Sequence, residues 1–172
     1  MRIVKFSELE NKEKYLDKLE NCPWDAGKYL GYLLKSGEIK KLCGEHTEVY
    51  CLLIDEELVS FCTLADFDDI QPTEFTPWIG FVYTYENYRG NRYSIKLMEA
   101  CEQVCRKNNV EYVYVSTNHI GLYEKGGYEF FQYMKDIEGS DSRVYRKNYK
   151  KKKIFENLLF ILIINLYLLP LS

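Results

Sequence analysis

The spacing of apolar side chains changes along the chain, and each spacing predicts an element. Residues 3–6 form a short apolar run typical of an edge strand. Ser7, with Glu10 three residues later, matches a capping box and predicts that a helix opens there. A second helix is expected to begin with Asp25 as its cap and to end at Ser36-Gly37. The first forty residues therefore predict strand, helix, helix.

The period then changes to that of strands. Residues 49–54 and 58–65 are β-rich runs flanking a tight acidic loop, which predicts a hairpin. An aromatic-rich strand is expected over 78–85, an amphipathic helix over 94–108 and a buried strand over 110–116. A strand, a crossover helix and a further strand require a parallel pair with a right-handed connection.

The remaining pattern closes the domain. Residues 120–125 predict one or two helical turns before Gly126-Gly127, and 128–134 with 143–145 predict a last pair of strands. The order of elements predicts an α/β fold with a mixed central sheet and helices on both faces. We expect a single domain over residues 1–147, followed by a C-terminal extension over 148–172.

Charge divides the chain at the same place. Of 23 Lys+Arg and 26 Asp+Glu in 172 residues, positions 1–142 hold 16 and 25 (net −9), and positions 143–172 hold 7 and 1 (net +6). An acidic body argues against nucleic acid as a partner, because phosphate neutralisation needs a positive surface. A small cationic substrate fits this body better.

Cysteine usage and the N-terminus point to the cytosol. The six cysteines form no CxxC pair and lie mostly in apolar runs, as buried reduced thiols do, so neither a disulfide framework nor a metal site is expected. The first fourteen residues lack the apolar stretch of a secretory signal.

The segment from 81 to 94 joins a strand to the start of the long helix. Free backbone N–H groups and the positive end of the helix dipole meet there and form an anion site, to which Arg89 and Arg92 add charge. A helix cap with a simple turn is the alternative. The local pattern therefore permits a phosphate site without establishing one.

Two motifs in the right order resemble the GCN5-related N-acetyltransferase (GNAT) superfamily. Residues 89–94 resemble its Arg/Gln-x-x-Gly-x-Gly/Ala loop, and residues 121–128 resemble its Leu-Tyr-Glu-Lys-x-Gly-Phe/Tyr segment. Arg92 stands where the family has its first glycine, and Ser94 replaces the final small residue. We expect either a backbone without positive φ at Arg92 or an altered loop, with the guanidinium contacting phosphate directly.

The resemblance implies acetyl-CoA as co-substrate, no metal, and transfer of the acetyl group to an amine of a small molecule or protein. In the family the fourth strand splays from the fifth, and its free backbone groups bind the pantetheine arm. The implied cofactor-binding residues are Val82, Tyr83, Thr84, Arg89, Gly90, Asn91, Arg92, Tyr93 and Ser94. Tyr123 matches the general acid that protonates the departing thiolate.

The general base is open at this point. Glu74 is one candidate, the acids Asp66, Asp68 and Asp69 are together another, and a chain of water molecules is a third. His119 is interpreted as a cap of the short helix before Tyr123.

The extension combines a basic cluster at 146–153 with an apolar segment at 154–171. Its most continuously apolar part is too short to span a bilayer. Contact with a membrane surface, packing against the domain or a second subunit in a homodimer, and a disordered or non-native extension all remain open.

Three functions compete on these grounds. The leading one is an acetyl-CoA-dependent N-acetyltransferase. A CoA-binding module without turnover is the second, because the loop departs from the family pattern. A membrane-tethered interaction protein, in which the extension carries the function, is the third.

Overall fold

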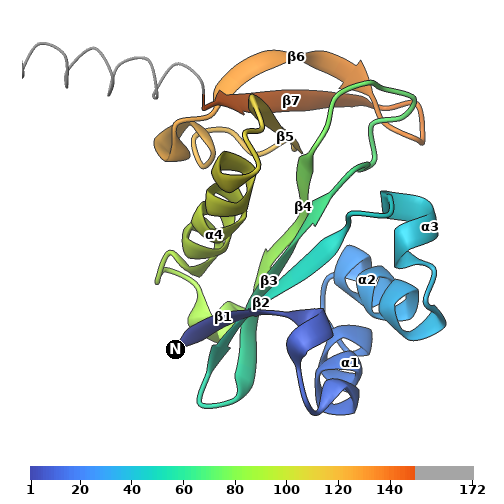
Figure 1. Ribbon diagram of the computed structural model, residues 1–172, viewed down its shortest axis with the longest axis vertical. Helices are drawn as coiled ribbons and strands as arrows, with labels where there is room; N and C mark the ends of the chain where they lie inside the picture. Colours follow the sequence, from blue (N-terminus) through green and yellow to red (C-terminus); the bar gives the residue numbers. More distant parts are fainter. Residues whose placement is uncertain (150–172) are drawn as a thin grey trace, which may run out of the picture.

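A computed structural model describes residues 1–149 of the chain, and the extension from 150 onward, with all that was expected of it, lies outside the described residues. The elements form one seven-stranded sheet with helices on both faces (Figure 1). In chain order the strands are β1 (Arg2–Lys5), β2 (Glu48–Ile54), β3 (Glu57–Ala65), β4 (Trp78–Thr84), β5 (Tyr112–Ser116), β6 (Glu129–Lys135) and β7 (Asp141–Asn148). The helices are α1 (Lys12–Glu20), α2 (Asp25–Ser36), α3 (Ile39–Cys43) and α4 (Tyr93–Lys107), with single 3₁₀ turns η1 (Phe6–Glu8), η2 (Glu86–Tyr88) and η3 (Glu124–Gly126).

The sheet confirms the predicted mixed topology. Its order is β1-β2-β3-β4-β5-β7-β6, and among these pairs only β4 and β5 run parallel, with α4 as their crossover. The expected final pair is present as β6 and β7, with β7 inserted between β5 and β6. The β2–β3 hairpin turns through Asp55 and Glu56, both with positive φ, as a two-residue turn between twisted strands requires.

Two apolar layers cover the sheet. One face packs Leu97, Met98 and Cys101 of α4 against β2, β3 and β5. The opposite face packs Leu16 and Leu19 of α1, together with α2, against β2 and β3. Figure 1 shows α4 on one side of the strands and α1, α2 and α3 on the other. The 3.6-residue spacing predicted these faces because each helix buries one stripe.

The N-terminal caps differ from the predictions. No helix opens at Ser7; its hydroxyl bonds Glu48 Oε2 at 3.3 Å, and Glu8 accepts the Lys5 N–H at 3.3 Å beside a 3₁₀ turn. Helix α1 starts later, at Lys12. Asp25 is the first residue of α2 rather than its cap, and it pairs with Lys28 at 2.9 Å. The polar side chains that were expected to cap these helices bond to other groups instead, because sequence spacing does not specify which partner a polar side chain meets in the fold.

The C-terminal end of the described chain is well anchored. Strand β7 continues through Asn148, and buried Tyr149 packs against the core beneath α4, with its N–H bonded to the Glu111 carbonyl at 2.9 Å. Within residues 1–149 no helix has the length and apolar content needed to cross a membrane.

Candidate active site

The parallel strands β4 and β5 separate soon after they meet. Their only paired residues are Trp78 and Tyr114, next to a bond from the Tyr114 N–H to the Pro77 carbonyl at 3.0 Å. From residue 79 onward, β4 has no ladder partner on its β5 side. Its backbone polar groups on that edge are therefore available to a ligand, because a strand must pair them or expose them.

A bulge in β4 sharpens this separation. Phe61 pairs with Tyr83 and Thr63 with Gly80, so Phe81 and Val82 together face the single residue Cys62. Phe81 lies in the left-handed region at φ 49°. Such a bulge bends a strand and re-aims the side chains that follow it.

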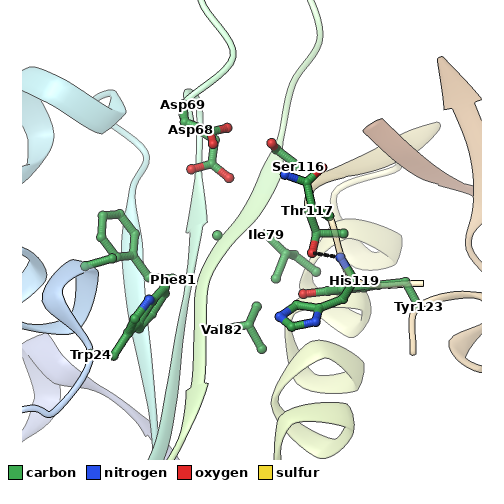
Figure 2. Close-up of a pocket in the computed structure, with 13 residues that line it drawn as sticks. Trp24, Asp68, Asp69, Ile79, Phe81, Val82, Ser116, Thr117, His119 and Tyr123 are labelled. Carbon is green, nitrogen blue, oxygen red and sulfur yellow. Dashed lines mark hydrogen bonds between the residues drawn. The ribbon is translucent and has the colours of Figure 1, made fainter. Parts of the chain in front are cut away.

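A cavity of about 590 Å³ occupies the gap, and we call it the cleft cavity. Figure 2 shows Asp68 and Asp69 at one end of it and Val82 toward the other, between Trp24 and His119. On its sides lie Trp24, Phe81, Thr117, His119 and Tyr123. The polar groups of the cleft cavity thus come from the segment at the start of α2, from the loop between β3 and β4, and from the segment after β5.

The turn from β4 into α4 is shaped to receive an anion. Gly90 takes φ 82° with open space where a side chain would lie. The first turn of α4 has N–H groups without intrahelical acceptors, at the positive end of the helix dipole. Arg92 is the N-cap, at φ 59° and ψ 29°. The expected backbone without positive φ at Arg92 is therefore wrong: the residue adopts the left-handed conformation that glycine favours.

The two arginines of this turn differ in their surroundings. Arg89 folds back on β4, donating to the Thr84 carbonyl at 3.1 Å and lying 5.6 Å above the ring of Tyr83. It also pairs with Glu86 at 3.4 Å. For the guanidinium of Arg92, no hydrogen bond or ion pair is found within residues 1–149. Arg92 is thus the arginine whose charge is free for a ligand.

The other residues expected around the cofactor surround this turn. Asn91 donates to the carbonyls of Tyr88 and Arg89 at 3.1 and 3.3 Å, and Tyr93 and Ser94 form the first turn of α4. Of the three β4 residues, Val82 lines the cleft cavity. The ring of Tyr83 lies on the opposite face of the sheet, stacked 5.5 Å from Trp24. The hydroxyl of Thr84 lies 2.8 Å from that of Ser60.

Tyr123 is buried at the wall of the cleft cavity. Its side chain is 5% exposed and its ring stacks on Tyr145 at 6.2 Å. Burial raises the pKa of its phenol to about 12, partly opposed by a hydrogen bond with Thr117. The hydroxyl therefore keeps its proton at neutral pH and can donate it.

Asp68 is the acid that the structure brings to the cavity. Burial raises the pKa of its carboxyl to about 7, the charge of Asp69 adds to the rise, and the Asp69 backbone N–H opposes it. The carboxyl lies against β4, because a Cβ on Gly80 would come within 2.7 Å of its Oδ2. A carboxyl with a pKa near neutrality is suited to proton transfer.

Of the remaining candidates, Asp69 and His119 line the cleft cavity and the others lie outside it. Glu74 is exposed and is not among the residues that line the cleft cavity. Asp66 accepts the backbone N–H of His46 at 3.0 Å and its ring nitrogen at 3.1 Å, which holds a turn. His119 lines the cavity but caps no helix: its N–H bonds the Thr117 hydroxyl at 3.1 Å. The sequence alone does not separate Asp68 from its acidic neighbours. In the fold Asp66 lies outside the cleft cavity, and of the two acids that line it, Asp68 is the more deeply buried, against Gly80.

A splayed parallel pair, a bulged strand and a helix N-terminus beside one cavity define an acyl-CoA-dependent transferase of the N-acetyltransferase class. A sequence model described as the acetyltransferase (GNAT) family matches residues 6–128. The chain belongs to this family, and it is an acetyltransferase.

Solved structures show the same fold. An acetyltransferase from Streptococcus agalactiae is 21% identical, with a TM-score of 0.61 over 86% of this chain and 98% of the other. A GNAT family acetyltransferase from Elizabethkingia anophelis, with acetyl-CoA bound, is 12% identical, with a TM-score of 0.60 over 86% and 97%. The aminoglycoside 6'-N-acetyltransferase from Enterococcus faecium is 14% identical, with a TM-score of 0.60 over 86% and 97%. A search of the curated proteins finds no match to the chain.

Proposed function

We propose that the chain transfers the acetyl group of acetyl-CoA directly to an amine, with Tyr123 as general acid and Asp68 as general base. The observation that carries the proposal is that a protonated phenol and a carboxyl with pKa near 7 line one cavity beside the unpaired edge of β4. Direct transfer requires both groups at the same place.

The residues present fit acetyl-CoA. The free edge of β4 suits an extended amide-bearing arm, because it offers unpaired backbone donors and acceptors. The first turn of α4, with Gly90 open and Arg92 free, suits a pyrophosphate. When bound, acetyl-CoA supplies an activated thioester carbonyl. A backbone N–H of β4 near Val82 would polarise that carbonyl.

Tyr123 and Asp68 then divide the proton transfers. The phenol is kept protonated by burial and donates to the sulfur that leaves. Asp68, ionised above about pH 7, removes a proton from the attacking ammonium so that its lone pair is free. We propose Asp68 in place of Glu74, because Glu74 is exposed and outside the cleft cavity.

A substitution at Tyr123 tests the chemistry separately from binding. In Tyr123→Phe, kcat for thiol release from acetyl-CoA with an amine acceptor should fall about 100-fold, the usual contribution of a general acid. Calorimetric affinity for acetyl-CoA should change little, because the phenyl ring keeps its packing. Tyr133→Phe is the matched control, since Tyr133 is 59% exposed and outside the cleft cavity.

The outcomes separate the competing functions. Acetyl-CoA that binds while the wild type transfers to no amine would identify a CoA-binding module. Absence of acetyl-CoA binding would refute both readings. Unchanged turnover in Tyr123→Phe would remove the general acid from the proposal and leave the family assignment intact.

We also propose that the protein works in a reducing compartment such as the cytosol. The six cysteines are buried and free, and the thiols of Cys62 and Cys101 share a hydrogen bond with sulfurs 3.6 Å apart. Buried free thiols fit a reducing compartment, where disulfides are rare.

A further inference from the structure

The turn that carries Tyr123 runs from Gly121 to Gly127, and the backbone takes positive φ at both ends (86° and 83°). Backbone hydrogen bonds hold the side that follows Tyr123. The N–H groups of Gly126 and Tyr128 both donate to the Tyr123 carbonyl, at 2.9 and 3.1 Å. The side that precedes Tyr123 is closed by a side chain instead.

That side chain is Glu124, whose carboxylate also joins the turn to β7. Its Oε2 atom accepts the Gly121 N–H at 2.7 Å, and its Oε1 atom accepts the hydroxyl of Tyr145 at 2.8 Å. The hydrogen bond from its own backbone N–H, followed by that from Tyr145, holds the pKa of Glu124 below its usual value. The group is therefore ionised at neutral pH and can accept with both oxygens.

Tyr145 is a rigid partner for this carboxylate. Its side chain is fully buried on β7, and its ring stacks on that of Tyr123 at 6.2 Å. Its hydroxyl accepts the Nε–H of Arg143 at 3.2 Å and gives its single proton to Glu124. Tyr145 therefore contacts the ring of Tyr123 directly and also fixes the turn that carries it.

Strand β7 reaches the turn at a second point. Lys147 lies two positions after Tyr145, on the same face of the strand, and donates to the Gly126 carbonyl at 2.7 Å. Tyr123 thus lies between two attachments to one strand. Lys147 also pairs with buried Glu102, so its loss would affect stability as well as the turn. The Tyr145 attachment is the better one to test, because it contacts Tyr123 itself.

We propose that Glu124 and Tyr145 are positioning residues for Tyr123, and that together they hold its phenol in place to protonate the departing thiolate. Neither is among the residues that line the cleft cavity, so both act through Tyr123. Proton donation needs the two heavy atoms within hydrogen-bond reach, and a small displacement of the donor lowers the rate. This inference rests on the proposed function and deepens it.

Tyr145→Phe removes the hydroxyl and keeps the ring against Tyr123. In the full chain, kcat for thiol release from acetyl-CoA with an amine acceptor should fall about tenfold, because the phenol of Tyr123 loses its fixed place. Calorimetric affinity for acetyl-CoA should be unchanged. Tyr133→Phe is the matched control with wild-type kcat, because the Tyr133 hydroxyl also accepts from Arg143, at 2.6 Å, but lies on β6 and is 59% exposed.

Substitutions at Glu124 test the same attachment from the other side. Glu124 is exposed, so Glu124→Ala should fold, and it should lower kcat about tenfold. Glu124→Gln should restore most of that loss, because the amide oxygen can accept the Gly121 N–H and the amide N–H can donate to the Tyr145 oxygen. Lys125→Ala is the matched control, since Lys125 is exposed in the same turn.

A double-mutant cycle with Tyr123→Phe separates positioning from general damage to the site. If Tyr145 acts through the phenol of Tyr123, Tyr145→Phe should lower kcat in the wild type and have no further effect in the Tyr123→Phe background. An equal loss in both backgrounds would show that Tyr145 supports the fold in another way, and would overturn the inference. Should Tyr145→Phe prove unstable in urea unfolding, Glu124→Ala carries the same cycle.

The inference and the proposed function fail on different results. A loss of about 100-fold in Tyr123→Phe beside wild-type kcat in Tyr145→Phe and Glu124→Ala would keep the general acid and overturn only the positioning. Wild-type kcat in Tyr123→Phe would remove the general acid, and with it the group that Glu124 and Tyr145 are proposed to position.

Discussion

At the residue scale, the carboxyl of Asp68 combines a chemical use with a cost to stability. Its ordinary pKa of 3.8 rises to about 7 in the fold because the group is buried. Above about pH 7 the native chain holds an ionised carboxyl that burial disfavours, and below about pH 4 both states are protonated. The native state therefore binds more protons than the unfolded state between these limits, so the penalty grows as pH rises.

Asp68→Asn should reveal both effects. At about pH 8 the variant should be more stable than the wild type by roughly 1–3 kcal/mol, and the difference should shrink toward zero as pH falls to about 4. Urea unfolding at several pH values measures it. The wild-type kcat/KM should rise through about pH 7, and the variant should lose that limb along with most activity.

Asp66→Asn is the control for Asp68→Asn, because Asp66 holds a turn away from the cleft cavity. A wild-type pH profile that is flat around neutrality would show that another group accepts the proton. An Asp68→Asn variant less stable than the wild type at high pH would show that the carboxylate is stabilised by its surroundings.

At the element scale, the N-terminus of α4 shows how a turn tolerates a departure from its family's pattern. Arg92 occupies a left-handed position where glycine has no steric penalty. An L-residue in this conformation costs about 1–2 kcal/mol of stability. The attraction between its positive charge and a bound anion can offset that cost. The same guanidinium is solvent-exposed and lacks a partner within the described residues.

Arg92→Asn separates backbone from charge, because Asn tolerates the left-handed region without a positive group. Stability should change by less than about 0.5 kcal/mol. Affinity for acetyl-CoA should fall about fivefold at low salt, and the loss should shrink as salt screens the contact. Calorimetric titration at two ionic strengths measures this. Equal affinity in the variant would mean that the backbone N–H groups alone hold the pyrophosphate.

At the scale of the whole molecule, one buried ion pair joins segments far apart in sequence. Lys147 of β7 donates to both carboxylate oxygens of Glu102 on α4, at 2.8 and 2.7 Å, and to the Gly126 carbonyl at 2.7 Å. The Glu102 side chain is 3% exposed. This contact fastens the last strand to the helix that carries the anion site.

Lys147→Met should destabilise the fold by about 2 kcal/mol, because it removes the Lys147 ammonium and leaves Arg106, at 2.9 Å, as the remaining cation beside a buried carboxylate. Urea unfolding measures the loss. Lys135→Met is the matched control, since its pair with Asp141 is exposed on both sides (64% and 67%) and should matter by less than about 1 kcal/mol. A double variant that also replaces Glu102 with Leu should recover most of the loss, and failure to recover would assign it to packing of the Lys147 stem.

The local sequence pattern predicted some features of the fold, and tertiary contacts decided others. The strands over 49–54 and 58–65 and the helix over 94–108 were predictable, because burying one face imposes a period on the residues themselves. The cap at Ser7 was not, since its hydroxyl bonds Glu48, which is 41 positions away in the sequence. The partner that a polar side chain bonds depends on which groups the assembled fold brings near it.

By itself, the sequence determined the α/β order of elements, the parallel pair around α4, and the family, through two short motifs whose backbone demands are local. It also singled out Tyr123 through its motif position, and the structure places that residue at the wall of the cleft cavity. Only the tertiary structure brought Asp68 and Asp69, but not Asp66, to the cleft cavity, and buried the Asp68 carboxyl against Gly80. Only it joined Tyr145 of β7 to Glu124, beside Tyr123. The reason is physical: periodicity records which face is buried, whereas a carboxyl's pKa and a cavity's charge depend on groups that folding brings together from distant positions.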